Sequence, residues 1–119
     1  MTTLVLHLPF PVSVNAMYAN NRGGGKGRYP TKKYKDWKQE AALAIKNGGF
    51  YHMAGEVSVA IYLGRPDKRK RDCDNLIKGV LDALTQNKVI EDDHKVIKVS
   101  VEWADVTGAK VEITNDKVE

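Results

Sequence analysis

Five cations run into two carboxylates near the middle of the chain. Arg65 and the run from Lys68 to Arg71 precede Asp72 and Asp74, which stand two residues apart. In an extended segment, residues i and i+2 project on one side, so both carboxylates can face a single cation. Carboxylate oxygens suit Mg²⁺ or Mn²⁺, which normally keep several waters and use few protein ligands. The segment therefore predicts a phosphate-attracting stretch beside a divalent-metal site.

Two further features supply what phosphodiester hydrolysis needs. The acidic run Glu91-Asp92-Asp93 is the nearest source of a third carboxylate for the metal. A metal held by carboxylates lowers the pKa of a water, orients it for in-line attack and neutralises charge on the transition state. Lys78 lies one helical turn after Asp74, where it can contact the scissile phosphate or the developing charge. The set favours metal-assisted cleavage of a phosphodiester.

Each of these features also has an ordinary structural interpretation. Asp74 is well placed as a helix N-cap, and Asp74 with Lys78 as a simple i, i+4 ion pair. The run Glu91-Asp92-Asp93 can be a solvated turn, and Lys68 to Arg71 a solubilising loop. These interpretations give no reason for clustered cations to abut clustered carboxylates, so their co-occurrence favours the functional hypothesis.

Alternating apolar residues predict the strands that position this segment. The alternation is clearest over residues 57–63 and also indicates strands over 4–8, 97–103 and, more briefly, 111–113. A turn at Thr107-Gly108 is expected to join the last two strands.

Helical spacing predicts two helices between these strands. The first follows an N-cap at Thr31 and ends at Gly48-Gly49; the second runs from about Asp74 to Asn87. Residues 12–30 are expected to be irregular, with a mobile glycine-rich loop at 22–28. The order β-α-β-α-β-β predicts one α/β (α+β) domain over residues 1–119, a mixed four-stranded sheet covered by two main helices.

The charge is divided unequally along the 119 residues. Residues 1–71 hold 13 basic and 4 acidic side chains, a balance of +9, whereas residues 72–119 hold 6 and 11, a balance of −5. A basic first part indicates a polyanionic partner. No run approaches the roughly 20 apolar residues of a membrane span, no signal-peptide pattern opens the chain, and the single Cys73 excludes an internal disulfide. We therefore expect a soluble, cytoplasmic protein.

The motif Arg69-Lys70-Arg71-Asp72-Cys73-Asp74-Asn75-Leu76-Ile77-Lys78, with Asp82-Ala83-Leu84-Thr85 and Asp92-Asp93 after it, resembles the RusA family of Holliday-junction resolvases. The resemblance extends to Leu8-Pro9-Phe10-Pro11 with Ser13 and Asn15, and to Asn21-Arg22-Gly23, so it covers nearly the whole chain. Members are small, dimeric, Mg²⁺-dependent endonucleases, often encoded by prophages. Cys73, at a position more often aliphatic, and the run Gly23 to Gly27 depart from the family pattern without removing a catalytic group.

The resemblance implies a role for individual residues. Asp72, Asp74 and Asp93 match the essential acidic residues that bind the metal, and Lys78 matches the essential lysine. Asp82 falls on a recurrent family position and is expected to be supporting at most. With the basic residues elsewhere in the chain, the residues expected to bind DNA are Arg22, Lys26, Arg28, Lys32, Lys33, Lys68, Arg69, Lys70, Arg71 and Asn75.

These expectations combine into one functional hypothesis and two alternatives. The hypothesis is a homodimeric, Mg²⁺-dependent endonuclease, with Mn²⁺ able to substitute, that resolves four-way DNA junctions. Such a protein would be bacterial or phage-encoded, cytoplasmic, and associated with the nucleoid when bound to DNA. One alternative is a non-catalytic nucleic-acid-binding module, and the other is a nuclease acting on flaps or other branched DNA.

Overall fold

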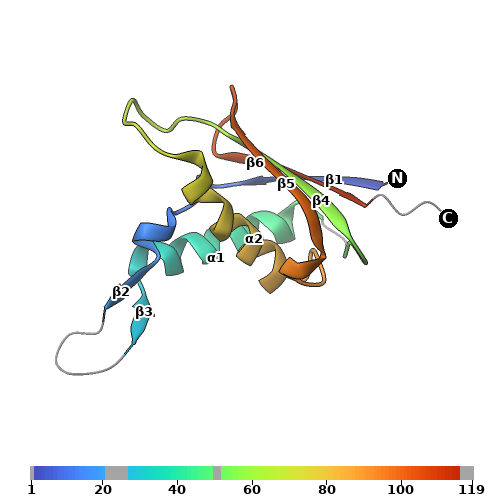
Figure 1. Ribbon diagram of the computed structural model, residues 1–119, viewed down its shortest axis with the longest axis horizontal. Helices are drawn as coiled ribbons and strands as arrows, with labels where there is room; N and C mark the ends of the chain where they lie inside the picture. The colour runs from blue at the N-terminus through green and yellow to red at the C-terminus, as the bar shows by residue number, and fades with distance from the viewer. Residues whose placement is uncertain (1, 21–26, 50–51, 116–119) are drawn as a thin grey trace.

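A computed structural model describes residues 2–20, 27–49 and 52–115. In these residues a four-stranded mixed sheet carries two α-helices on one face, and a separate two-stranded ribbon projects beyond the helices (Figure 1). Neither helix in the described ranges is long and apolar enough to cross a bilayer. The fold class and the order of the main elements predicted from the sequence are confirmed. The main elements are β1 (Thr2–Leu8), α1 (Lys32–Asn47), β4 (Val57–Leu63), α2 (Ile77–Gln86), β5 (Val96–Trp103) and β6 (Ala109–Asn115).

The sheet has the spatial order β1-β6-β4-β5. β6 pairs antiparallel with both β1 and β4, whereas β4 and β5 are parallel. β1, β4 and β5 therefore run in one direction, and their carboxyl ends lie at the same edge of the sheet. The segments that follow these strands are brought together for that reason.

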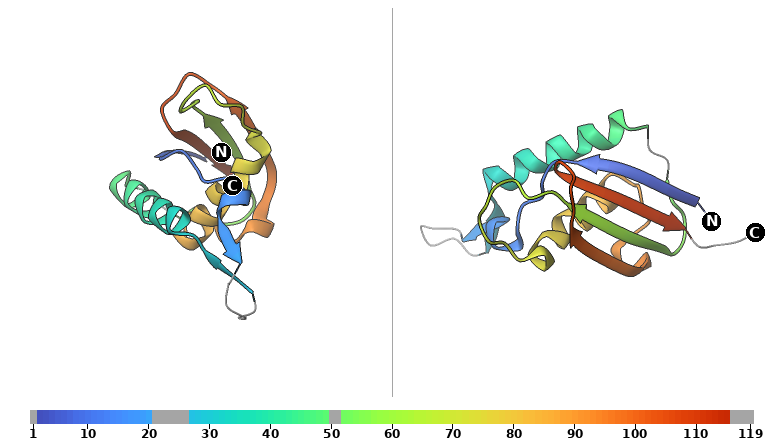
Figure 2. Two further views of the ribbon diagram at one scale, coloured as in Figure 1. Left: turned by 90° about the vertical axis from the view of Figure 1, so that its left-hand side faces the viewer. Right: turned by 90° about the horizontal axis from the view of Figure 1, so that it is seen from above.

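The core lies between the sheet and the two helices. Period-two alternation buries one face of each inner strand, as in β4, where Val57, Val59, Ile61 and Leu63 are buried. Tyr34, Trp37, Ala41 and Ile45 form the buried stripe of α1, and Val80, Ala83 and Leu84 that of α2. Figure 2 shows both helices on the same side of the sheet.

The first helix begins and ends where the sequence predicts. The Thr31 side chain accepts a hydrogen bond from the backbone N–H of Tyr34 at 3.2 Å, and Gly48 follows the last turn. The second helix is different, because a 3-10 helix, η2 (Cys73–Leu76), precedes α2. The assumption that Asp72 and Asp74 lie in an extended segment is therefore wrong: Asp72 is extended, but Asp74 lies within the 3-10 turn.

One further expectation about local structure is wrong. Residues 12–30 are not wholly irregular, because η1 (Val14–Ala16) leads into a ribbon in which β2 (Tyr18–Asn20) pairs with β3 (Arg28–Pro30). The stretch 21–26 of the glycine-rich loop lies outside the described residues. The turn expected at Thr107-Gly108 is confirmed: it joins β5 to β6, and Gly108 has a φ of 71°, although the two strands are not neighbours in the sheet. β6 instead enters the sheet between β1 and β4.

Candidate functional site

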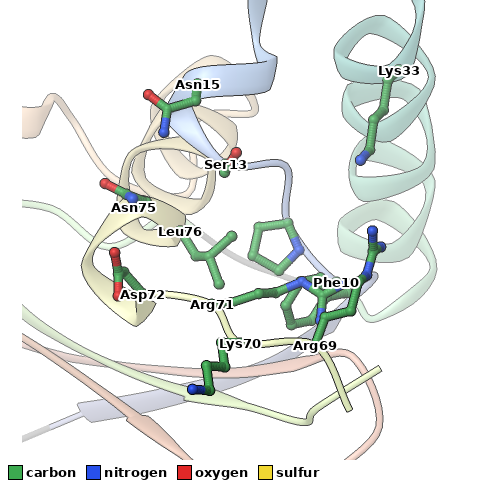
Figure 3. A pocket seen from close by; sticks show the side chains of 11 residues that line it. Phe10, Ser13, Asn15, Lys33, Arg69, Lys70, Arg71, Asp72, Asn75 and Leu76 are labelled. Carbon is green, nitrogen blue, oxygen red and sulfur yellow. The ribbon is translucent and has the colours of Figure 1, made fainter. Parts of the chain in front are cut away.

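A cavity of about 440 Å³ opens beyond the carboxyl ends of β1 and β4. Its walls come from the segment after β1, from the segment between β4 and α2, and from the first turn of α1 (Figure 3). Ligand sites in sheets with parallel strands commonly lie at this edge. The lining residues are Phe10, Pro11, Ser13, Asn15, Lys33, Arg69, Lys70, Arg71, Asp72, Asn75 and Leu76.

The cavity is strongly basic. Lys33, Arg69, Lys70 and Arg71 line it, whereas Asp72 is the one carboxylate in its lining. Four cations around one cavity attract the phosphates of a nucleic-acid backbone. A phosphate bound there would lie next to the Asp72 carboxylate. The structure thus brings together five of the predicted DNA-binding residues, the fifth being Asn75.

Asp67 orients the side chains of the basic loop, which is formed by residues 65–71. Its two carboxylate oxygens accept hydrogen bonds from the Arg71 guanidinium at 2.6 and 3.0 Å, and one also accepts from the Arg69 backbone N–H at 2.9 Å. Hydrogen bonding from Arg71 is the main reason that the pKa of Asp67 lies well below its usual range. The paired Arg71 is thereby oriented, while the Lys33 and Lys70 ammonium groups have no ion-pair partner among the described residues.

A stacked pair of aromatic rings, Phe10 and Trp103, packs against this loop. The rings of Phe10 and Trp103 lie nearly parallel, with centroids 6.2 Å apart and an interplanar angle of 14°. The Arg65 guanidinium lies 4.3 Å from the Trp103 centroid, and that of Arg71 lies 5.6 Å from the Phe10 centroid. Cation–π contacts at these distances hold one end of the Arg65–Arg71 loop against Trp103 of β5 and the other against Phe10, which follows β1.

Asp72 and Asp74 are exposed, with no side-chain hydrogen bond or ion pair within the described parts of the chain. Asp72 is the N-cap residue of η2 but its side chain makes no capping bond, and Asp74 lies in the first turn. The interpretation of Asp74 as the N-cap is therefore wrong. Carboxylates that have no hydrogen-bond or ion-pair partner within the described residues are available to bind a hard cation such as Mg²⁺.

Lys78 pairs with Asp82 rather than with Asp74. The Lys78 ammonium lies 3.3 Å from an Asp82 oxygen, and the other Asp82 oxygen accepts a hydrogen bond from the Tyr34 hydroxyl at 3.1 Å. Burial, followed by the negative charge of Asp82, raises the pKa of Tyr34. Asp82 thus joins α2 to α1, which fits the supporting role expected for it. The Lys78 side chain remains 57% exposed and accessible to a ligand.

Asp93 lies at the opposite end of α2 from Asp72 and Asp74 in the folded chain. It precedes β5, at the amino end of the parallel pair, and its carboxylate accepts a hydrogen bond from the Thr85 hydroxyl at 2.5 Å. Thr85 follows Asp74 by 11 residues, which is on the order of 15 Å along a helix. Among the described residues, no three His, Cys, Asp or Glu side chains come close enough to hold one metal ion. The assignment of all three aspartates as metal ligands stays a prediction.

The remaining predicted DNA-binding residues lie outside the cavity lining. Lys32 forms an exposed ion pair with Asp36 at 2.7 Å, and the Arg28 guanidinium packs 5.1 Å from the Tyr18 ring centroid on the ribbon. Lys68 is exposed on the basic loop. Arg22 and Lys26 belong to residues that the structure does not describe.

Sequence reasoning did not assign site roles to the residues after β1. Phe10, Pro11, Ser13 and Asn15 form one wall of the cavity, although their segment is far from the acidic motif in sequence. The signal was present, since the family resemblance includes this segment. Composition and periodicity give no means of pairing it with residues 65–76.

The fold and the cavity define a small α/β protein built to receive a polyanion beside exposed carboxylates. The sequence profile of the family described as Endodeoxyribonuclease RusA matches residues 9–114. The Crossover junction endodeoxyribonuclease RusA of Escherichia coli (strain K12) is 36% identical over 116 residues, 96% of this chain and 94% of that protein. The proteins of that name from Shigella sonnei (strain Ss046) and Enterobacteria phage 82 are each 35% identical with the same coverage. The chain belongs to the RusA family of endodeoxyribonucleases.

Proposed function

We propose that this protein is a homodimeric, Mg²⁺-dependent endonuclease that resolves four-way DNA junctions. The observation that carries the proposal is the basic cavity at the carboxyl edge of the sheet, with the unpaired carboxylate of Asp72 in its lining. Family membership and relatives named for crossover junction cleavage support the same conclusion.

Asp72 and Asp74 are the residues proposed to hold Mg²⁺. Both are exposed carboxylates, and magnesium sites commonly use one or two carboxylates and keep several waters. When bound, the ion would activate a water and neutralise charge at the cleaved phosphodiester, with Mn²⁺ able to substitute. Asp93 is retained as a proposed third ligand on the strength of the family motif.

The chain's own cations bind and orient the DNA backbone. Lys33 of α1 and Arg69 and Lys70 of the segment after β4 would contact phosphates from two sides of the cavity, while Arg71 presents a guanidinium whose orientation Asp67 fixes. Phosphate contacts position the duplex and carry little sequence information. The exposed Lys78, on the first turn of α2, is proposed to reach the scissile phosphate or the leaving oxygen.

Resolution of a junction requires two cuts in strands of like polarity. A two-fold symmetric dimer offers two equivalent active sites to the four arms of a junction. The proposed enzyme therefore acts as a homodimer.

The test compares cleavage of a synthetic four-way junction, a flap and linear duplex, each with Mg²⁺ and with a chelator. We expect paired, metal-dependent nicks in the junction, and loss of cutting in Asp72→Asn and Asp74→Asn with junction binding retained. Glu40→Gln, which removes a negative charge from an exposed position of α1, is the matched control and should cut normally. Equal cutting of all three substrates would refute a resolvase and indicate a less selective nuclease.

A non-catalytic DNA-binding module is the second candidate. It is favoured by the position of Asp72 and Asp74 at the amino end of η2, where carboxylates stabilise a helix electrostatically. A module of this kind would bind the junction but show no metal-dependent nick in the wild-type protein. Its Asp72→Asn variant would lose stability instead.

Asp93→Asn tests the proposed third ligand separately. We expect it to abolish cutting while leaving junction binding intact or tighter, because it removes a metal ligand and a negative charge. Loss of binding in this variant would indicate that the bond from Thr85 to Asp93 is structural.

A further inference from the structure

The two-stranded ribbon β2–β3 begins and ends at the rim of the basic cavity. Asn15 lines the cavity three residues before β2 begins, and Lys33 lines it three residues after β3 ends. Figure 1 shows the ribbon projecting away from the sheet, beyond the start of α1. Both strands of the ribbon therefore continue from walls of the candidate site.

Hydrogen bonds fix the base of the ribbon to the start of α1. The Thr31 hydroxyl donates to the Ala16 carbonyl at 2.8 Å, and the Thr31 N–H donates to the Met17 carbonyl at 2.8 Å. The rings of Tyr18 and Tyr34 pack edge to face, with centroids 5.7 Å apart. Strands of three residues are too short to be stable by themselves, so these contacts hold the ribbon in its orientation toward the cavity.

One face of the ribbon is occupied by contacts within the protein. The registers Tyr18↔Pro30 and Asn20↔Arg28 place these side chains on the same face. The Arg28 guanidinium lies 5.1 Å from the Tyr18 ring centroid, and Tyr18 in turn packs against Tyr34 of α1. This face is therefore turned toward α1.

Tyr29 lies on the opposite face, and its ring is uncovered. It is in register with Ala19, whose methyl group is too small to cover the ring. The Tyr29 side chain is 49% exposed, and its ring makes no aromatic or cation–π contact with the other described residues. An aromatic ring held by a strand with its faces open is a platform on which a nucleic-acid base can stack.

The surroundings of Tyr29 are positively charged. Residues 27–35 contain no carboxylate and four cations, which are Arg28, Lys32, Lys33 and Lys35. Lys32 pairs with Asp36, whereas Lys33 and Lys35 have no ion-pair partner within the described ranges. Aromatic rings set among cations are the arrangement by which proteins bind unpaired nucleotides.

The spacing places Tyr29 near any DNA held in the cavity. Tyr29 precedes Lys33 by four residues, so their Cα atoms lie within about 14 Å of each other. That length corresponds to about four nucleotides at about 3.4 Å each. Bases within a duplex are paired and stacked on both sides, whereas the last base pair of each arm of an opened junction has one face without a stacking neighbour.

We propose that Tyr29 stacks on a base at the branch point of the junction, and that the β2–β3 ribbon thereby distinguishes branched DNA from plain duplex. The inference rests on the proposed function, because it names the part of that substrate which the ribbon recognises. The cavity binds phosphates, which duplex and junction share. An open base face is the feature that a duplex lacks.

Equilibrium binding to a four-way junction and to linear duplex, both in chelator, tests the stacking contact. Tyr29→Ala should weaken junction binding roughly 10-fold and leave duplex binding unchanged, because loss of a base–aromatic stack has an effect of that order. Tyr29→Leu keeps an apolar side chain in the ribbon but has no ring, and it should lose junction affinity in the same way. Tyr29→Phe keeps the ring and should bind as wild type does.

Leu43→Ala is the matched control. It removes an apolar side chain that is 60% exposed on α1 and does not line the cavity, so both affinities should stay at the wild-type values. Thermal unfolding of each variant reports whether the fold is retained.

Photocrosslinking locates the contact on the DNA. 5-Iodouracil crosslinks on irradiation to an aromatic side chain that is stacked against it. A junction with this base beside the branch point should therefore crosslink to Tyr29, as identified by mass spectrometry of the labelled peptide. The crosslink should be absent in Tyr29→Leu and when the label is moved to the middle of an arm.

Three results would each overturn the inference. They are unchanged junction affinity in both Tyr29→Ala and Tyr29→Leu, an equal loss of affinity for junction and duplex, and a crosslink at the branch point to a residue other than Tyr29. An equal loss on both substrates would indicate a groove or backbone contact instead of stacking.

None of these measurements uses cleavage or metal, so their outcomes separate this inference from the proposed function. A protein that binds the branch point through Tyr29 but does not cut junctions with Mg²⁺ would retain the stacking contact and refute the proposed activity. A protein that cuts junctions and is indifferent to substitution of Tyr29 would retain the activity and refute the stacking contact.

Discussion

Replacing Lys33 by glutamine should weaken junction binding and make it less sensitive to salt. Lys33 is one of four cations in the cavity lining. Each phosphate contact contributes about −0.9 to the slope of log K against log salt. Four contacts would give about −3.6, which corresponds to a loss of about 150-fold in affinity between about 50 and 200 mM salt. Loss of the Lys33 contact should make the slope shallower by about 0.9, or about 1.8 where both chains of a dimer contact one junction.

Fluorescence anisotropy of a labelled junction at several salt concentrations measures this slope. Lys46→Gln is the matched control, since Lys46 is an exposed lysine of the same helix. It follows Lys33 by 13 residues, roughly 20 Å along the axis, and does not line the cavity. Equal slopes for wild type and Lys33→Gln, or an equal change in both variants, would refute the cavity as the phosphate-binding surface.

Three other substitutions probe the surroundings of the site. Asp67→Asn should increase affinity for plain duplex in the same assay, because it removes the negative charge that competes with phosphate for the arginines of the loop; weaker binding would contradict this. Tyr34→Phe should cost about 1 kcal/mol near neutral pH through its lost bond to Asp82, measured by urea denaturation. Because the folded-state pKa of Tyr34 is raised above 10.0, the unfolded chain ionises first, so wild-type stability should fall as pH rises above about 10, and this fall should be smaller in the variant. Gly64→Ala would place a Cβ 1.7 Å from the Val106 carbonyl oxygen and should lower the free energy of unfolding by roughly 3 kcal/mol, measured by thermal or urea unfolding. A change near zero would show that the backbone there adapts.

Local periodicity was sufficient to locate the main elements. The alternation of Val57, Val59, Ile61 and Leu63 predicts β4 with its observed bounds, because one face of that strand is buried. The order of strands within the sheet could not be obtained in the same way. Alternation specifies which face of a strand is buried but not which strand lies beside it, so the position of β6 between β1 and β4 could not be predicted from it.

Part of the candidate site was predictable because it is contiguous in sequence. Arg69, Arg71 and Asp72 meet at the cavity since they follow one strand. The assignment of Asp93 as a third metal ligand rests on the family motif and on nearness in sequence, and it stays a prediction. A helix separates Asp93 from the earlier aspartates and carries it to the other end of the parallel strand pair.

The placement of β6 also determines when this protein can fold during its synthesis. β6, the last strand in the described residues, lies inside the sheet, in register with β1 from Thr2↔Asn115 to Leu8↔Ala109, and with β4 on its other side. Until β6 has left the ribosome, β1 has no strand to pair with and β4 lacks one of its two neighbours. We therefore expect the sheet to assemble after translation of β6, through contacts of long sequence separation that slow folding. A nascent chain stalled before Ala109 would expose the apolar faces of both strands to chaperones.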